Sequence, residues 1–439
     1  MLIRIVFKPV YQFIVNLTKG DATRLVVSKL LTYPIIAFST LYAFKIVRQE
    51  FQLDLFNSFV LLWTSIGFVG LFEYAFGIYL TNHILILGFD RTFRQKVKKI
   101  CIILIAPPVL VIILGISIVF KIGKYEIFNG IAFRGMSIGQ LLICCPLAII
   151  FLTLYNLTTR ISNGVSSFVY PQITLAIGNL IVVCGLRLVS SYQIGILVYL
   201  DILASAYLIS ACLQLATKHL RVQIRKFAPR KVNDSSHYNF FGNNYSLIVL
   251  FISGLVTFLN LYPRWGFSKF ASQTELSWYL IVSVVLGIFA SLSSTLSPLL
   301  WNRGINRARN VTSNFPRFEY RYALIGNLIL FFPFMFTYIW LTHFYDLSIG
   351  SLDVFLLGLV GFLCLSVQNL HLIASNYLNE RSELLLQLKL LVVQSLTFVW
   401  IVNWLSIDSA LSLLICQLGI SLFLSFIPTF FVFRKISNG

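Results

Sequence analysis

Hydrophobic runs of about 20 residues, separated by short polar segments, recur along the whole chain. A membrane-crossing α-helix needs about 20 mainly apolar residues, so each run is a predicted span. The pattern predicts twelve spans, at residues 25–45, 55–80, 100–120, 137–157, 168–188, 193–216, 245–263, 277–299, 322–342, 353–375, 384–404 and 409–433. We therefore expect an all-α polytopic membrane protein.

The basic residues fix an orientation for these spans. With the N-terminus placed inside, 24 of the 34 lysines and arginines fall on inner segments, eight fall on the outer side, and Lys29 and Lys389 lie within spans. Cytoplasmic loops are enriched in Lys and Arg, so both termini are predicted to be cytoplasmic. Much of the formal charge of +19 is thereby explained by topology. The chain shows no basic domain or zinc-ligand spacing, and we expect no nucleic-acid partner.

The longest predicted inner loop divides the chain near its middle, with six spans on each side. In both halves an acid, Asp54 or Glu275, precedes a long second span. Two parallel six-span halves are a known transporter plan, with the substrate site between them. The predicted parts are an interfacial N-terminal segment 1–24, a six-helix bundle 25–216, a basic cytoplasmic linker 217–244, a second six-helix bundle 245–433 and a cytoplasmic tail 434–439.

Two lysines lie inside predicted spans at similar depth from the inner surface: Lys29 in the first and Lys389 in the eleventh. A charge at the bilayer centre costs roughly 3 kcal/mol on insertion scales. One interpretation is that each lysine extends its stem back to the interface. The other is that both face a water-filled cavity and attract an anion from the cytoplasm.

A second tier of cations is predicted at the outer side: Arg187 and Arg264 near the outer ends of spans 5 and 7, and Arg134 at the outer start of span 4. Arginine suits phosphate because its planar fork donates two hydrogen bonds. Two tiers suit an anionic head group that moves from one leaflet to the other. The alternative is that these arginines bind lipid phosphates at the surface.

Acids and prolines inside the spans are the remaining candidates. Glu73 and Asp201 are predicted to lie within the bilayer, where a carboxylate is paired with a cation or protonated. They are candidates for charge pairing or for carrying a coupling ion, H⁺ or Na⁺. Pro34, Pro107 and Pro108 each remove a backbone hydrogen bond, which makes them candidate hinges or sites of static packing.

Two motifs of known enzymes are absent from the sequence. It has no Gly-rich phosphate loop and no HExxH, and no metal site or organic cofactor is indicated. The predicted outer loops are also short, whereas a membrane glycosyltransferase or glycan polymerase needs a sizeable outer loop for its acceptor. We therefore expect a protein that is not an enzyme.

Two stretches resemble the Wzx-type O-antigen and capsule flippases, which share the MOP superfamily with the multidrug (MATE) exporters and the lipid II flippase. In PRWGFSKFASQTELSWYLIVSVVLGIFASLSSTLSPLLW at 263–301, the matching residues are Arg264, Glu275, Tyr279 and Pro298. Pro263 replaces the usual acid, and Ser277 or Trp278 replaces the usual glycine. In FQLDLFNSFVLLWTSIGFVGLFEYAFGIYLTNHI at 51–84, the matches are Glu73, Gly77 and Leu80–Thr81–Asn82.

The resemblance implies a twelve-helix, two-bundle fold with a cationic central cavity and ion-coupled alternating access. It implies a flippase for an undecaprenyl-pyrophosphate-linked oligosaccharide, the repeat unit of O-antigen lipopolysaccharide or capsule, in the bacterial inner membrane. Lys29 and Lys389 are similar to cations in the family's first and eleventh spans. Implied partners are the lipid-linked oligosaccharide and membrane lipids, with a glycan polymerase and a chain-length regulator as further candidates. The alternative is a MATE-like ion-coupled multidrug exporter, whose cationic substrates favour acids in the cavity.

Overall fold

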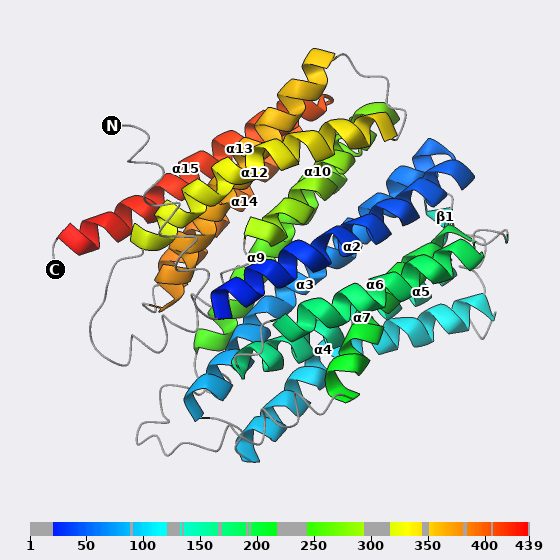
Figure 1. Ribbon diagram of the computed structural model, residues 1–439, viewed down its shortest axis with the longest axis horizontal. Helices are drawn as coiled ribbons and strands as arrows, with labels where there is room; N and C mark the ends of the chain where they lie inside the picture. The colour runs from blue at the N-terminus through cyan, green and yellow to red at the C-terminus, as the bar shows by residue number, and fades with distance from the viewer. Residues whose placement is uncertain are drawn as a thin grey trace. The chain divides into compact units, whose positions relative to one another are not determined.

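The computed structural model describes residues 21–87, 91–120, 132–133, 136–165, 169–189, 192, 195–216, 244–293, 317–344, 351–380, 384–404 and 407–437. They form twelve α-helices and one small hairpin (Figure 1). The elements are α2 (Asp21–Glu50), α3 (Leu53–Leu87), α4 (Arg91–Val119), β1 (Ala132–Phe133), β2 (Met136–Ser137), α5 (Ile138–Gly164), α6 (Val169–Val189), α7 (Ile196–Ala216), α9 (Asn244–Phe267), α10 (Gln273–Ser293), α12 (Arg317–Phe344), α13 (Ser351–Glu380), α14 (Leu384–Trp404) and α15 (Ala410–Ser437).

The predicted all-helical architecture is confirmed, because each of the twelve helices overlaps one predicted span. Many helices are longer than the apolar run on which the prediction rests. α4, for example, begins at Arg91, nine residues before the predicted span, because a helix keeps its backbone hydrogen bonds after it leaves the apolar layer. Within the described residues, α4, α5, α6, α7 and α14 are long and apolar enough to cross a membrane.

The small hairpin was not predicted. Ala132 pairs with Ser137, and Phe133 with Met136, in antiparallel register directly before α5.

The helices of the two halves pack in matching pairs. In the first half α4 packs on α5 and α5 packs on α7; in the second half α12 packs on α13 and α13 packs on α15. In span order these are the third, fourth and sixth helices of each half. The repeat suggested by the six spans on each side of the central loop therefore extends to helix packing.

The chain forms two compact units. Unit 1 comprises Met1–Pro34, Ile281–Leu390 and Ser409–Gly439; unit 2 comprises Ile35–Leu280 and Leu391–Asp408. Unit 2 thus takes in α9 and the start of α10, which the predicted division at 217–244 assigns to the second bundle. The predicted bundle boundaries stay a prediction, and the linker at 217–243 and the N-terminal segment up to residue 20 lie outside the described residues.

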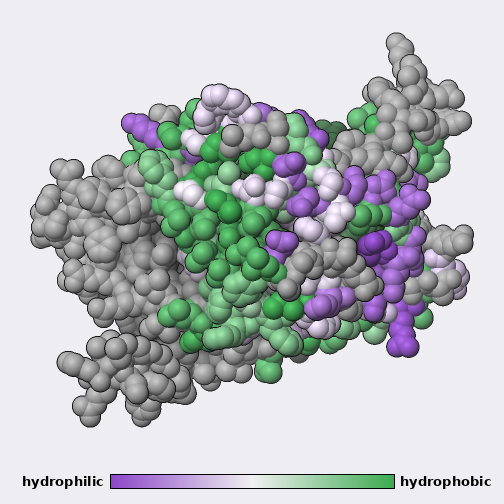
Figure 2. Space-filling view, turned by 90° about the horizontal axis from the view of Figure 1, so that it is seen from above, coloured by the Kyte–Doolittle hydropathy of each residue, from purple (hydrophilic) through white to green (hydrophobic). Residues whose placement is uncertain are grey.

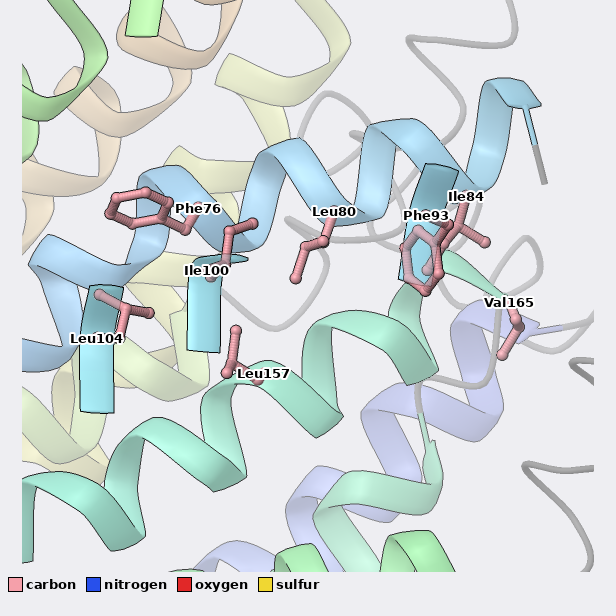
Figure 3. Close-up of a cluster of buried hydrophobic side chains, with 8 residues drawn as sticks. All are labelled: Phe76, Leu80, Ile84, Phe93, Ile100, Leu104, Leu157 and Val165. Atoms are coloured by element: carbon pink, nitrogen blue, oxygen red, sulfur yellow. The ribbon is translucent and has the colours of Figure 1, made fainter. Parts of the chain in front are cut away.

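Unit 2 has a hydrophobic core where α3, α4 and α5 meet (Figure 3). The helical spacing of its members, four residues apart on α3, brings them to one face of each helix. The buried side chains are Phe76, Leu80, Ile84, Phe93, Ile100, Leu104, Leu157 and Val165.

Close helix approach in unit 2 depends on a glycine of α6. A Cβ built on Gly178 would lie 2.5 Å from the carbonyl oxygen of Ala206 in α7. Small residues allow such contacts between membrane helices, where van der Waals packing drives association. Gly185, seven residues further along α6, has nothing within 4 Å of the same built atom.

Unit 1 packs through aromatic rings. Phe289 of α10 meets Phe334 of α12 edge to face at 5.3 Å, and Phe334 lies 5.4 Å from Phe362 of α13. Offset and edge-to-face pairs place the positive ring edge on a negative ring face.

Many large apolar side chains are exposed on the helices that form these units. Figure 2 shows broad apolar areas among the described residues. Leu110, Leu328 and Phe332 are exposed by 66%, 71% and 75%. Such surfaces would promote aggregation in water, whereas a bilayer requires them.

The candidate hinge prolines all lie inside continuous helices. α2 runs through Pro34, and α4 runs through Pro107 and Pro108. The division between the two units crosses α2 directly after Pro34. That coincidence supports Pro34 as a hinge, and the hinge role of the three prolines stays a prediction.

Candidate functional site

Lys29 lies on a buried polar stripe of α2. Ser28, Lys29 and Thr32 are each only 8% exposed. Thr32 Oγ1 donates a hydrogen bond to the carbonyl oxygen of Ser28 at 2.7 Å, and Lys29 Nζ lies 5.6 Å from the centre of the Tyr33 ring. A ring face within about 6 Å attracts a cation and offsets part of its desolvation. Lys29 is therefore held in the interior of the protein.

Lys389 has the opposite environment. It is exposed, and the residues at helical spacing around it on α14 are exposed and apolar: Leu385, Val392, Val393 and Leu396. A lysine on an apolar outer stripe is typical of a side chain that extends to the interface. Of the two interpretations of the in-span lysines, burial favours a cavity role for Lys29, and exposure favours the interfacial role for Lys389.

Arg264 is a buried arginine near the end of α9. It is 8% exposed, and its Nη1 donates to the carbonyl oxygen of Asn260 one turn earlier. The hydroxyl of Tyr279 interacts with it electrostatically, and the Tyr279 ring packs edge to face on Phe267 at 5.3 Å. A guanidinium keeps its charge in such surroundings, so this position carries a permanent buried cation.

The other two predicted outer cations differ from Arg264. Arg187 lies in the last turn of α6 and is exposed. Its exposure favours the interpretation that it meets lipid phosphates. Arg134, between the hairpin strands, lies outside the described residues.

Asp201 is a partly buried acid on α7, opposite α5. Its carboxyl group lies against the Cys144 thiol, and its Oδ1 is buried without a hydrogen-bond partner. Among the described residues no cation pairs with it. Burial without a cation favours the coupling role over charge pairing. Glu73 lies in α3, and its side chain is outside the described residues.

A hydrogen-bonded contact joins the first half of the chain to the second at the predicted outer side. Asn57 Nδ2 donates to the Gln273 backbone oxygen and to Gln273 Oε1, both at 2.9 Å. Ser277 Oγ donates to Asn57 Oδ1 at 2.7 Å. Eight residues further along α3, Ser65 Oγ accepts a hydrogen bond from Trp265 Nε1 of α9 at 3.0 Å.

Asn57 and Ser277 occupy equivalent positions, because each is the fifth residue of the second helix of its half. Both are fully buried. In a structure with two parallel repeats, equivalent residues meet only near the axis that relates the repeats. The sequence did not predict this contact. It did single out the same turn of each helix, because Asp54 lies three residues before Asn57 and Glu275 lies two residues before Ser277.

Buried neutral polar groups form a second set that the sequence did not reveal. Ser39 Oγ of α2 donates to Asn179 Oδ1 of α6, and Asn179 Nδ2 donates to the Leu175 oxygen at 2.9 Å. Thr174 and Ser210 share a hydrogen bond of 2.8 Å between α6 and α7. These groups satisfy one another and hold helices together.

No family model and no curated protein matches the chain. Solved structures match its fold over nearly its whole length. A MATE-family multidrug resistance transporter of the MOP superfamily, in an outward-facing conformation, is 12% identical with a TM-score of 0.58, covering 97% of this chain and 98% of that chain. The lipid II flippase MurJ, in an inward closed conformation, is 15% identical with a TM-score of 0.56, covering 93% and 87%.

A third match is a MOP superfamily transporter from Pyrococcus furiosus, for which the reversed polarity of the binding pocket suggests a different function. It is 13% identical with a TM-score of 0.57, covering 96% of this chain and 98% of that chain. The chain therefore has the fold of the MOP superfamily transporters. That fold serves drug export and lipid flipping alike, so the substrate has to be argued from the side chains.

Proposed function

We propose that the protein is a flippase that moves an undecaprenyl-pyrophosphate-linked oligosaccharide across the bacterial inner membrane. The observation that carries the proposal is the burial of two cations, Lys29 and Arg264, at opposite predicted levels of the membrane. A buried cation is costly, and it persists where it binds an anion. A pyrophosphate head group is such an anion, and the resemblance to Wzx-type flippases at 51–84 and 263–301 supports the same class.

In this mechanism the head group first binds Lys29 near the cytoplasmic side while the polyprenyl tail stays in lipid. Arg264 then binds the pyrophosphate near the outer side, where two guanidinium N–H groups suit phosphoryl oxygens. The glycan is never exposed to hydrocarbon.

In alternating access, the binding site opens first to the cytoplasmic side and then to the outer side of the membrane. The contact of Asn57 with Gln273 and Ser277 holds the predicted outer ends of α3 and α10 together. Opening toward the outside requires this contact to break. A disulfide between Asn57→Cys and Ser277→Cys should block transport in oxidant and restore it in reductant, and undiminished transport in the fully cross-linked protein would contradict this step.

The proposed coupling group is Asp201. Hard cations such as Na⁺ prefer several oxygen ligands, whereas the neighbour of this carboxyl group is a thiol. These surroundings suit H⁺ better than Na⁺.

The test is complementation of a bacterial strain that lacks its own O-antigen flippase. Wild-type protein should restore surface glycan, and Lys29→Ala and Arg264→Ala should each reduce it more than about tenfold, the loss expected when a desolvated charge contact is removed. Lys389→Ala is the matched control and should retain it. Normal glycan from both Lys29→Ala and Arg264→Ala would refute the proposal.

A MATE-like multidrug exporter is the second candidate, and Asp201 is the observation in its favour, because a buried acid suits a cationic drug. It predicts that deleting the gene sensitises the host to cationic drugs and that Asp201→Asn reproduces the effect. The flippase proposal predicts unchanged drug sensitivity and loss of surface glycan.

A further inference from the structure

Three described side chains of unit 1 each bury a polar atom that has no hydrogen-bond partner: Ser28 Oγ on α2, the Tyr338 hydroxyl on α12 and Gln387 Oε1 on α14. Tyr338 lies near the predicted outer end of its span, whereas Ser28 and Gln387 lie near the predicted cytoplasmic side. Ser28 is 8% exposed and Gln387 7%. Buried polar groups in proteins are nearly always hydrogen-bonded, so an unmatched one needs a reason.

Other buried hydroxyl groups on the same helices form hydrogen bonds with the backbone. Thr32 Oγ1 donates to the carbonyl oxygen four residues back, and Ser395 Oγ of α14 does the same to Leu391 at 2.8 Å. Such back-bonding is the usual fate of a Ser or Thr within a membrane helix. The Ser28 hydroxyl does not form this bond, so it stays available as a donor.

The unmatched groups of Ser28 and Gln387 lie at the same level of their helices. Ser28 and Gln387 are each the fourth residue of a predicted span, counted from the cytoplasmic side. Ser28 is also the neighbour in sequence of the buried Lys29. Gln387 is buried on α14, whereas Lys389, two residues on and therefore on the opposite side of the helix, is exposed.

The two groups differ in what they can bind. A serine hydroxyl beside an ammonium donates to phosphoryl oxygens, which only accept. The amide oxygen of Gln387 is itself an acceptor, so it repels phosphoryl oxygens and needs a donor. Sugar hydroxyls are such donors.

We propose that Ser28, Lys29 and Gln387 form the cytoplasmic-side substrate contacts, with Ser28 and Lys29 binding the pyrophosphate and Gln387 accepting a hydrogen bond from a sugar hydroxyl. This inference rests on the proposed flippase function. It replaces the pair of lysines suggested by the sequence with a lysine, a hydroxyl and an amide. Gln387 thereby distinguishes a glycosylated lipid from a bare one.

The experiment measures binding to the purified full-length protein of three lipids: undecaprenyl pyrophosphate, the same lipid carrying N-acetylglucosamine, and phosphatidylglycerol. Ser28→Ala should weaken binding of both pyrophosphate lipids about 3- to 10-fold, the effect of one hydrogen bond. Gln387→Leu should weaken only the glycosylated lipid, by a similar factor. Lys389→Leu is the matched control on α14 and should change neither.

Thermal unfolding of the same variants separates binding from structure. Removing an unmatched buried polar group relieves a desolvation penalty, so Ser28→Ala and Gln387→Leu should keep or raise the melting temperature while binding falls. A lowered melting temperature would show that each group has a structural partner, and unchanged binding would show that it meets no substrate. Either result overturns the inference.

The wild-type protein reports on the proposed function separately. If it binds neither pyrophosphate lipid, the flippase proposal fails together with this inference. If phosphatidylglycerol binds as tightly and is as sensitive to Ser28→Ala, the site serves phospholipid head groups and the inference fails. If the wild type prefers the glycosylated lipid and both variants behave like it, only the inference fails.

Discussion

The predicted inner turns of α2 and α14 look alike in sequence, but their lysines lie in different environments. Each has a lysine within an apolar run at a similar predicted depth. Lys29 is buried beside Ser28 and over the Tyr33 ring, whereas Lys389 lies on an exposed apolar stripe. A charge in a span is therefore not by itself a sign of a binding site, because the helix face decides whether the side chain meets protein or the surroundings.

The same contrast recurs for other residue types. On α6, Gly178 faces the Ala206 carbonyl at close range, and Gly185 faces open space. Asp201 buries a carboxylate oxygen, and Asp353 in the first turn of α13 is exposed. Each pair places one residue type in two environments. The same substitution made at both positions therefore shows how much of its effect is due to the environment.

The largest effect is expected for the glycines. Gly178→Leu would force α6 and α7 apart and cost about 3 kcal/mol or more, enough to remove most folded protein. Gly185→Leu should be tolerated, because its side chain has room. Detergent-extracted monodisperse yield and melting temperature measure both, and equal yields of the two variants would contradict the described packing of α6 on α7.

The second largest difference is expected between the transport rates of the two lysine variants. Lys29→Gln removes the charge and leaves a polar side chain that is one atom shorter, and we expect transport to fall more than about tenfold. Lys389→Gln should stay within about twofold of wild type, because an exposed charge contributes little. Initial rates of lipid-linked glycan translocation in reconstituted vesicles give the comparison. A larger loss for Lys389→Gln would reverse the assignment.

A smaller effect is expected for the acids, because it concerns coupling. Asp201→Asn should make translocation insensitive to an imposed pH gradient and slow it, because an amide cannot take up and release the coupling proton. Asp353→Asn should retain the response. Vesicles with separate pH and Na⁺ gradients provide the measurement, and a rate that follows Na⁺ alone would refute the proton assignment.

The smallest effect is expected for Lys389→Leu. Placing an apolar residue on the exposed stripe of α14 should leave transport unchanged and raise the melting temperature by about 1–2 °C, as one removed desolvation penalty allows. A matching Lys29→Leu variant should lose transport even if its melting temperature rises equally. Loss of transport in Lys389→Leu would show that this lysine works in the substrate path.

The sequence by itself determined the number, order and approximate limits of the twelve helices. Hydrocarbon requires about 20 apolar residues with internally satisfied backbone, so spans are local properties that a single chain reveals. The six predicted spans on each side of the central loop also indicated a repeat, which the matching packing of α5 with α7 and α13 with α15 supports.

Only the tertiary structure decided which side chains face inward. Lys29 and Lys389 both lie in largely apolar runs, and a single lysine in such a run does not show which face of its helix meets the protein. The contact of Asn57 with Ser277 joins residues 220 positions apart, and no local pattern encodes such a pairing. The packing of neighbouring helices decides which side chains are buried. It therefore also decides which residues are candidates for binding and which lie at the lipid surface.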